Sequence, residues 1–140
     1  MNEVRMSFSA ILDNVNFARG VIIGFLMNTD TEMPFINEIK TVISEAVTNS
    51  IIHGYNEDSS KFVFLNIKYD DEMVYAEVID YGIGIEDIEK AREPLYTTMI
   101  DEERAGLGFT IMEVFTDELT VESSLNKGTK ITFKKRFVRH

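Results

Sequence analysis

The most informative part of the chain is the segment EAVTNSIIHGY, residues 45–55. It belongs to a predicted helix that Thr31 and Pro34 open, because proline is accommodated in the first turn of a helix, and that ends near Gly54. At about 100° per residue, one side of this helix is a core face. The residues of that face are Ile36, Ile39, Ile43, Ala46, Val47 and Ser50. The polar stripe on the opposite side consists of Glu38, Glu45, Asn49 and His53.

Glu45 and Asn49 are four residues apart, so their side chains are neighbours on this stripe. Such a pair is often only part of a solvated helix face, but Val42 and Ile52 flank it, which indicates that another part of the chain covers it. A carboxylate can accept a proton from a hydroxyl group, and an amide oxygen can ligate Mg²⁺. The pair therefore fits phosphoryl transfer, which needs both roles.

A second motif, D-x-G-x-G at Asp80, Gly82 and Gly84, follows a predicted strand. Glycines at a strand end allow a tight turn and a close approach to a flat ligand, and Asp80 can accept a hydrogen bond from an exocyclic amine. Taken alone, the motif also fits an ordinary turn. It is not a dinucleotide-binding fingerprint, because the third glycine and a parallel βαβ pattern are missing, and there is no Walker A lysine motif.

Two further glycine-containing motifs follow, and the first of them fits a phosphate-binding site. Gly106 and Gly108 open a predicted helix, where free backbone N–H groups and the helix dipole favour an anion, and Arg104 adjoins them. Gly128 and Thr129 lie in the last predicted hairpin. Each pair also has an ordinary structural interpretation, as a loose helix start or a plain turn. The four motifs together, in this order, are hard to explain by chance.

The remaining pattern predicts the fold class. Residues 4–9 alternate as a strand, and Asp13 or Asn14 is positioned to cap a helix running to about Asn28. The later predicted elements are a hairpin of residues 61–69 and 72–79, a short helix within 80–105, a helix over 107–116, and a hairpin of 119–123 and 129–137. Strands grouped in hairpins predict a two-layer α/β sandwich of the α+β type, with a mixed but mostly antiparallel sheet and helices on one face.

Length and composition exclude several classes of protein. The 140 residues predict one domain over residues 1–140, and the absence of cysteine excludes disulfides and thiolate chemistry. The formal net charge of −10 argues against nucleic acid or an anionic membrane as partner. Residues 70–103, with 12 acidic and 2 basic side chains, account for this excess. No apolar run is long enough for a membrane span and no signal peptide is visible, so we expect a cytoplasmic protein.

The combination of motifs resembles the Bergerat-type ATP-binding fold of the GHKL superfamily. Within it, residues 45–55, Pro94-Leu95-Tyr96-Thr97-Thr98 and Gly106-Leu107-Gly108-Phe109-Thr110-Ile111-Met112 are similar to the anti-sigma serine-protein kinases of endospore-forming bacteria. The likeness covers nearly the whole chain. Met99 is a departure, because relatives tend to carry lysine after the two threonines.

The resemblance implies a role for each matching position. Glu45 would be the general base, Asn49 the Mg²⁺ ligand, Asp80 the carboxylate that reads adenine, and Arg19 a partner contact. The nucleotide-binding residues that it implies are Asn49, His53, Asp80, Gly82, Gly84, Thr97, Thr98, Arg104, Gly106, Leu107, Gly108, Phe109 and Thr129. A histidine such as His53 is otherwise more often a structural hydrogen-bonding group.

By the same resemblance, the chain would be a homodimeric anti-sigma factor with ATP and Mg²⁺ as its cofactors. It would bind and inhibit a sporulation sigma factor and phosphorylate a serine of the anti-anti-sigma protein. An autophosphorylating histidine kinase is disfavoured, since the chain has only His53 and the terminal His140. The alternative is a non-catalytic module that sequesters a sigma factor with ATP as a structural ligand, although it would have no use for Glu45. The first strand is a candidate dimer edge.

Overall fold

The computed structural model describes residues 1–92 and 108–138. Its elements are β1 (Asn2–Ser9), α1 (Asp13–Leu26), α2 (Met33–Asn49), the π-helical turn η1 (Ser50–Gly54), β2 (Phe62–Tyr69), β3 (Met73–Asp80), α3 (Ile88–Arg92), β4 (Glu118–Ser124) and β5 (Gly128–Arg136). Residues 108–114 form a further helical segment. No helix in these two ranges is long and apolar enough to cross a membrane.

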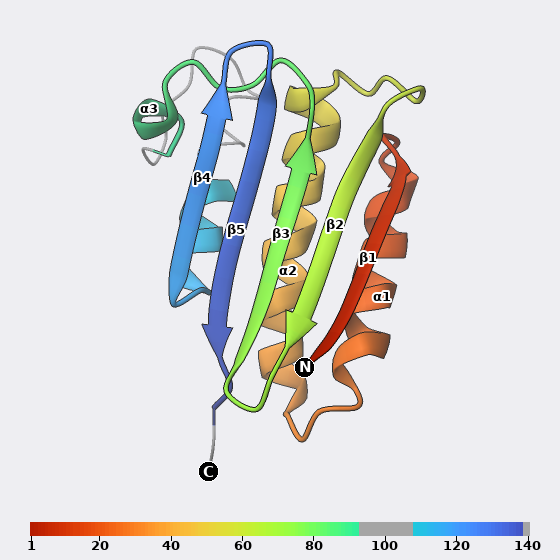
Figure 1. Cartoon of the computed structure of the whole chain (residues 1–140), viewed down its shortest axis with the longest axis vertical. Helices are drawn as coiled ribbons and strands as arrows, with labels where there is room; N and C mark the ends of the chain where they lie inside the picture. The colour runs from red at the N-terminus through yellow and green to blue at the C-terminus, as the bar shows by residue number, and fades with distance from the viewer. Residues whose placement is uncertain (93–107, 139–140) are drawn as a thin grey trace.

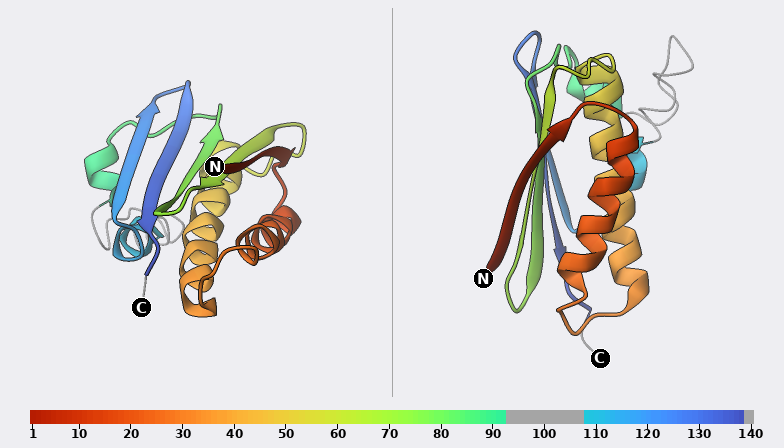
Figure 2. Two further views of the ribbon diagram at one scale, coloured as in Figure 1. Left: turned by 60° about the horizontal axis from the view of Figure 1, so that its bottom comes forward. Right: turned by 90° about the vertical axis from the view of Figure 1, so that its right-hand side faces the viewer.

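The strands form one five-stranded sheet in the order β1-β2-β3-β5-β4. All four neighbouring pairs are antiparallel, so the predicted two-layer α+β sandwich is confirmed, with an antiparallel rather than mixed sheet. Helices α1 and α2 and the segment 108–114 cover one face of the sheet, and the other face is open (Figures 1 and 2). Because β5 lies between β3 and β4, Thr129 at the start of β5 is paired with Asp80 at the end of β3.

Alternation along the strands produces the two faces of the sheet. In β2, Val63, Leu65 and Ile67 are buried beneath the helices, and β3 alternates in the same way. Helix α2 buries its predicted core face against these side chains. Fully burying an aliphatic side chain of this kind contributes roughly 1.5–3 kcal/mol, so this layer of contacts sets the position of α2 on the sheet.

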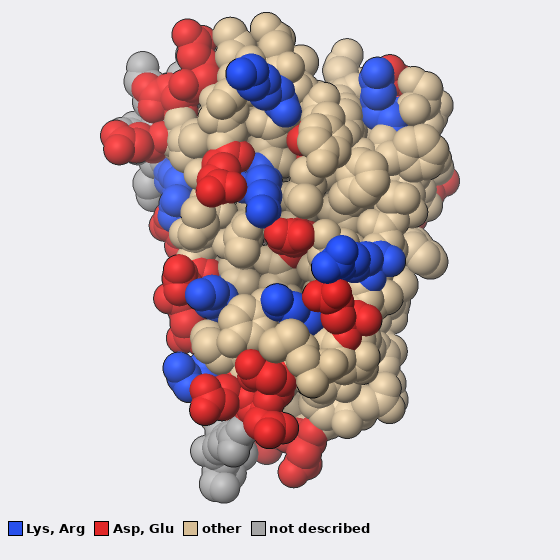
Figure 3. All heavy atoms as spheres, in the orientation of Figure 1, with Lys and Arg blue, Asp and Glu red and all other residues tan. Residues whose placement is uncertain are grey.

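The open face carries charges of both signs among uncharged side chains, which include the exposed Phe62 and Phe64 (Figure 3). Lys68, Lys130 and Lys134 alternate there with Glu77 and Glu118 on neighbouring strands. Lys130 forms an ion pair with Glu77 at 3.4 Å, and Lys134 with Glu118 at 3.6 Å. An antiparallel sheet with one solvated face normally shows this pattern.

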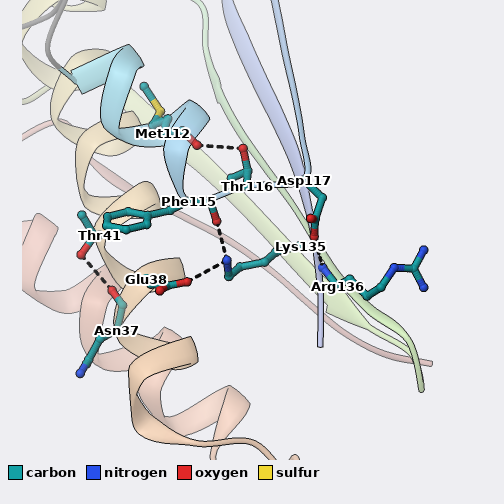
Figure 4. Close-up of polar contacts among 9 residues, drawn as sticks. All are labelled: Asn37, Glu38, Thr41, Met112, Phe115, Thr116, Asp117, Lys135 and Arg136. Atoms are coloured by element: carbon teal, nitrogen blue, oxygen red, sulfur yellow. Dashed lines mark hydrogen bonds and ion pairs between the residues drawn. The ribbon is translucent and has the colours of Figure 1, made fainter. Parts of the chain in front are cut away.

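The polar stripe of α2 is covered, as Val42 and Ile52 indicate. Val42 is fully buried, and the segment 108–114 packs nearby with Met112 and Phe109 in the core. Lys135 on β5 connects this segment to α2: its ammonium group forms an ion pair with Glu38 at 2.8 Å and donates a hydrogen bond to the Phe115 carbonyl at 2.8 Å (Figure 4). Both contacts converge on one cation whose side chain is only 14% exposed.

Two local predictions were wrong. Neither Asp13 nor Asn14 caps α1, because the capping position is Leu12 and the Asn14 amide donates to the Ser9 carbonyl at 2.9 Å instead. The second helix is also not α-helical to its end. It leaves the α-helical pattern after Asn49 and continues as the π-turn η1, in which Tyr55 N donates to the Ser50 carbonyl at 3.0 Å.

Candidate functional site: a buried carboxylate and a glycine cradle at the end of helix α2

The end of β3 places a carboxylate inside the protein. Asp80 is 3% exposed and is one of the few buried polar residues, with Ser50. It accepts hydrogen bonds from Gly82 N at 3.0 Å, from the Ser50 side chain and from Thr129 N. Burial raises the pKa of the Asp80 carboxyl above its ordinary value of 3.8, and these three hydrogen bonds act against that rise. A carboxylate held in this way is a fixed acceptor for a ligand donor.

Glycines surround Asp80 because no side chain fits at their positions. A Cβ on Gly54 would lie 2.7 Å from the Asp80 carboxylate, and a Cβ on Gly82 would lie 1.9 Å from the Gly54 carbonyl oxygen. Gly84 has a φ of +75°, and a Cβ there would lie 2.0 Å from the Ser124 carbonyl oxygen. Gly128 has a φ of +102°, and a Cβ there would lie 2.1 Å from the Asp80 carbonyl oxygen. The glycines therefore let η1, the 80–84 turn and the β4–β5 hairpin meet without side chains between them.

Thr129 joins this cluster through both its backbone and its side chain. Its backbone N–H donates to Asp80, and its hydroxyl is 2.8 Å from the Ser123 hydroxyl across the hairpin. The Ser123 oxygen also accepts a hydrogen bond from Ile85 N at 2.7 Å. Figure 1 shows the ends of β3 and α2 and the turn between β4 and β5 at the same end of the molecule.

Glu45 and Asn49 lie on the last turns of α2, next to the start of the segment 108–114. A Cβ on Gly108 would be 2.9 Å from Glu45 Oε2 and 3.8 Å from Asn49 Nδ2. Asn49 Nδ2 is buried and has no hydrogen-bond partner among the described residues. A buried amide group without a partner is costly, and the two ends of an amide can exchange places to present nitrogen or oxygen. The site therefore offers a polar group to a ligand beside Glu45.

Comparisons with known proteins agree with this geometry. A family model described as a histidine kinase-like ATPase domain matches residues 8–135. An anti-sigma F factor from Geobacillus kaustophilus is 49% identical over 138 residues, covering 99% of this chain and 94% of that protein. One from Bacillus subtilis is 46% identical over 134 residues, covering 96% and 92%. The chain belongs to the anti-sigma F factor family.

The fold of this anti-sigma F family member also occurs in a solved structure. The RsbU and RsbW domains of a Mycobacterium tuberculosis protein superpose with a TM-score of 0.73 and 21% sequence identity. The match covers 100% of this chain and 34% of the other. At this identity the likeness shows the shared fold alone.

Membership in a family of histidine kinase-like ATPase domains implies ATP as the ligand. The described residues fit a nucleotide in two respects. The Asp80 carboxylate is held as a fixed acceptor among closely packed glycines, and Asn49 Nδ2, which is buried without a partner among the described residues, lies with Glu45 beside Gly108. In this anti-sigma F family member the two features belong to one continuous segment, because α2 leads directly into η1.

The structure brings together part of the predicted site. Gly108 lies against Glu45 and Asn49, while Gly82, Gly84 and Thr129 gather around Asp80. His53 is half-buried within η1, and Phe109 contributes its side chain to the core. Arg19 is exposed on α1, apart from this cluster. The predicted residues that lie outside the described ranges are Thr97, Thr98, Arg104, Gly106 and Leu107.

Sequence reasoning missed residues that hold Asp80 from behind. Ser50 was assigned to the core face of the helix, yet its hydroxyl binds the Asp80 carboxylate. Gly54 and Tyr55 were read only as part of a motif, and both contact the 80–83 turn. A signal for Ser50 was available, because it is the one hydroxyl-bearing residue among apolar side chains on that face.

Proposed function

We propose that this protein is an ATP-dependent serine-protein kinase and anti-sigma factor. In this role it binds and inhibits a sporulation sigma factor and transfers the γ-phosphoryl group of Mg-ATP to a serine of the anti-anti-sigma protein. The observation that carries the proposal is that one continuous helical segment reaches two polar sites. Its α2 part carries Glu45 beside Gly108, and its continuation, Ser50–Tyr55, contacts Asp80 and the turn that follows it. The printed names of the curated relatives support the anti-sigma role.

Each end of this segment has its own task. The Asp80 carboxylate would accept a hydrogen bond from the exocyclic amine of adenine. Thr129 would lie beside it, and Gly82 and Gly84 would form the floor of the pocket. Asn49 would hold Mg²⁺ together with water and phosphate oxygens, since Mg²⁺ is bound through few protein ligands. Glu45 would accept the proton of the serine hydroxyl as that oxygen attacks phosphorus.

The predicted partners remain part of the proposal. Arg19, exposed on α1, would contact a protein partner. Strand β1 is an edge of the sheet, so its outer backbone groups are available to a second copy in a homodimer. The reaction would take place in the cytoplasm, and nucleic acid has no part in it.

One experiment separates this proposal from its alternatives. The protein is incubated with Mg-ATP labelled at the γ-phosphate and with the anti-anti-sigma protein of the same organism, and labelled phosphoserine is measured. The proposal predicts transfer to serine. Nucleotide binding without transfer would instead support a non-catalytic module that sequesters the sigma factor, and the absence of both would reject a nucleotide site.

A further inference from the structure

Tyr55 connects the end of the base-bearing helix to the Asp80 turn. Its side chain is buried, with 8% exposed, directly after η1. Its hydroxyl accepts a hydrogen bond from Tyr81 N at 2.7 Å and donates one to the Phe62 carbonyl at 2.7 Å. The hydroxyl therefore joins the residue after Asp80 to the first residue of β2, on the neighbouring strand.

The same short segment holds the turn at two further points. The Gly54 carbonyl accepts a hydrogen bond from Ile83 N at 2.9 Å, and the Ser50 side chain donates to the Asp80 carboxylate. Ser50, Gly54 and Tyr55 thus contact the carboxylate, the far side of the turn and its near side, respectively. Because this segment continues α2, it fixes the turn relative to the helix of Glu45 and Asn49.

The Tyr55 contacts depend on η1 being a π-turn. In η1 the Tyr55 N–H reaches the Ser50 carbonyl, five residues back, so the segment holds one residue more per turn than an α-helix. An α-helical continuation would rotate Tyr55 away from its present direction. Single π-turns inside helices are frequent at functional sites, and this one contains Ser50 and Gly54, which contact the Asp80 turn, and leads directly to Tyr55.

The chemistry of a phenol suits this position. Burial is the main cause that raises the pKa of Tyr55, and the nearby Asp80 carboxylate acts in the same direction. The neutral hydroxyl can accept from one backbone group while it donates to another. Phenylalanine would fill the same space but would leave Tyr81 N and the Phe62 carbonyl without this partner.

We propose that Tyr55 is a positioning residue for adenine recognition. Its hydroxyl holds the Tyr81 backbone, and with it Asp80 and the glycine turn, in the orientation that receives the base. The inference rests on the proposed function, because it assigns adenine to the Asp80 end of the site. Tyr55 acts through Asp80 and leaves the transfer chemistry at Glu45 unaffected.

The test compares Tyr55→Phe with the wild type in nucleotide affinity and in base discrimination. ATP and inosine triphosphate are titrated separately, since the latter lacks the exocyclic amine. We expect Tyr55→Phe to weaken ATP binding roughly tenfold, as for one lost hydrogen bond to a buried group, and to reduce the preference for ATP by a similar factor. The rate of phosphoryl transfer at saturating ATP should stay within about twofold.

Tyr75→Phe is the matched control. Its hydroxyl bonds Asp70 at 3.2 Å at the opposite end of β3, so its loss should change neither affinity nor discrimination. All proteins are made with Gly24→Ala, an exposed site in α1 where nothing lies within 4 Å of the added Cβ and alanine favours the helix. This background raises the stability of each variant equally.

Each outcome decides the proposal. Unchanged ATP affinity in Tyr55→Phe overturns it, as does an equal loss of affinity for both nucleotides, which would indicate a merely structural role. Failure to fold even in the stabilised background has the same meaning. Asp80→Asn is measured in parallel. If that variant also binds ATP normally, the proposed adenine site itself is wrong. If Asp80→Asn weakens ATP binding while Tyr55→Phe leaves it unchanged, only the role of Tyr55 is rejected.

Discussion

At the scale of single residues, the site is built from positions where a side chain is excluded. Gly54, Gly82 and Gly128 each lie so close to backbone or carboxylate atoms that a Cβ would overlap them. Because these positions have no side chain, η1, the 80–84 turn and the β4–β5 hairpin can pack closely around Asp80. The buried carboxylate is thereby held by backbone and hydroxyl donors, and within residues 1–92 and 108–138 no cation contributes to its pKa shift.

Gly108 offers a test of the other end of the site. In Gly108→Ala the new Cβ would lie 2.9 Å from Glu45 Oε2, the movable end of a long side chain, so Glu45 should shift while the fold is retained. A displacement of the base by about 1 Å can cost up to ~100-fold in rate, and we expect a loss of this order in phosphoryl transfer. ATP affinity should change far less. Gly20→Ala, in open space on α1, is the control, and equal transfer rates in the two variants would contradict the expectation.

The sequence predicted the proposed chemical groups of the site more readily than the residues that contact them. Glu45, Asn49 and Asp80 were assigned from residue type and spacing, and the structure places each in a polar site. Ser50 and Tyr55 were missed because the helix was assumed to stay regular to Gly54. Nothing in helical periodicity predicts a π-turn, and Tyr55, whose hydroxyl bonds the residue after Asp80, follows that turn directly.

At the scale of elements, the segment 108–114 is held against α2 by Lys135. The cation is largely buried, contacts Glu38 and the Phe115 carbonyl, and lies 5.5 Å from the centre of the Phe35 ring. A cation near the last turn of a helix also compensates the helix dipole. Lys135 therefore ties the segment beside Glu45 and Asn49 to the helix that carries them (Figure 4).

Lys135→Met should destabilise the protein by about 1–3 kcal/mol, because a charge-assisted hydrogen bond is lost and Glu38 loses its partner. The measurement is urea unfolding followed by circular dichroism. Lys134→Met is the matched control: its ion pair with Glu118 is exposed, and its removal should change the free energy of unfolding by no more than about 0.5 kcal/mol. Equal destabilisation by the two substitutions would show that Lys135 has no special role.

Elements with a strong period were predicted well, with the ends of β2 to β5 placed within one residue, whereas the cap of α1 and the end of the second helix were not. Strands β2 to β5 were found from alternation and from turn residues, and the structure confirms both hairpins. The cap of α1 was wrong because Asn14 bonds the Ser9 carbonyl, a contact that depends on how β1 leads into the helix. Such competition between local and tertiary partners is not encoded in the local sequence alone.

At the scale of the whole molecule, carboxylates decide how the protein responds to acid. The pKa of Glu77 is lowered chiefly by a hydrogen bond from Asn66 at 2.7 Å and also by Lys130, and hydrogen bonds lower the pKa of Asp58 and Asp70. A carboxyl whose pKa is lowered in the folded state stabilises the protein at pH values above its ordinary pKa, which is 4.5 for Glu77. This stability is lost as the pH falls from that value through the lowered pKa of the folded state. Asp80 has the opposite sign, since its raised pKa means that its contribution is lost as the pH rises.

Glu77→Gln should therefore flatten the fall in stability below pH 4.5 while costing no more than about 1 kcal/mol at neutral pH, because the pair is partly exposed. The free energy of unfolding is measured in urea at a series of pH values. Glu118→Gln, on the edge strand β4, is the control. A pH profile of Glu77→Gln that coincides with the wild type would contradict this assignment.

Net charge predicted less than its distribution did. A value of −10 argued against nucleic acid, and ATP is compatible with it only where donors are local. The open face carries both signs of charge (Figure 3). The excess of acidic side chains lies in residues 70–103, part of which is outside the described ranges.

The central claim is that one nucleotide is served by two carboxylates with different roles, Asp80 for the base and Glu45 for the serine proton. The most direct test measures ATP affinity and phosphoserine formation on the same two variants. We expect Glu45→Gln to lose about 10² to 10⁴ in transfer rate with ATP affinity kept within a few fold, whereas Asp80→Asn should lose ATP affinity first. Unchanged turnover in Glu45→Gln, or an unaltered ATP dissociation constant in Asp80→Asn, would contradict it.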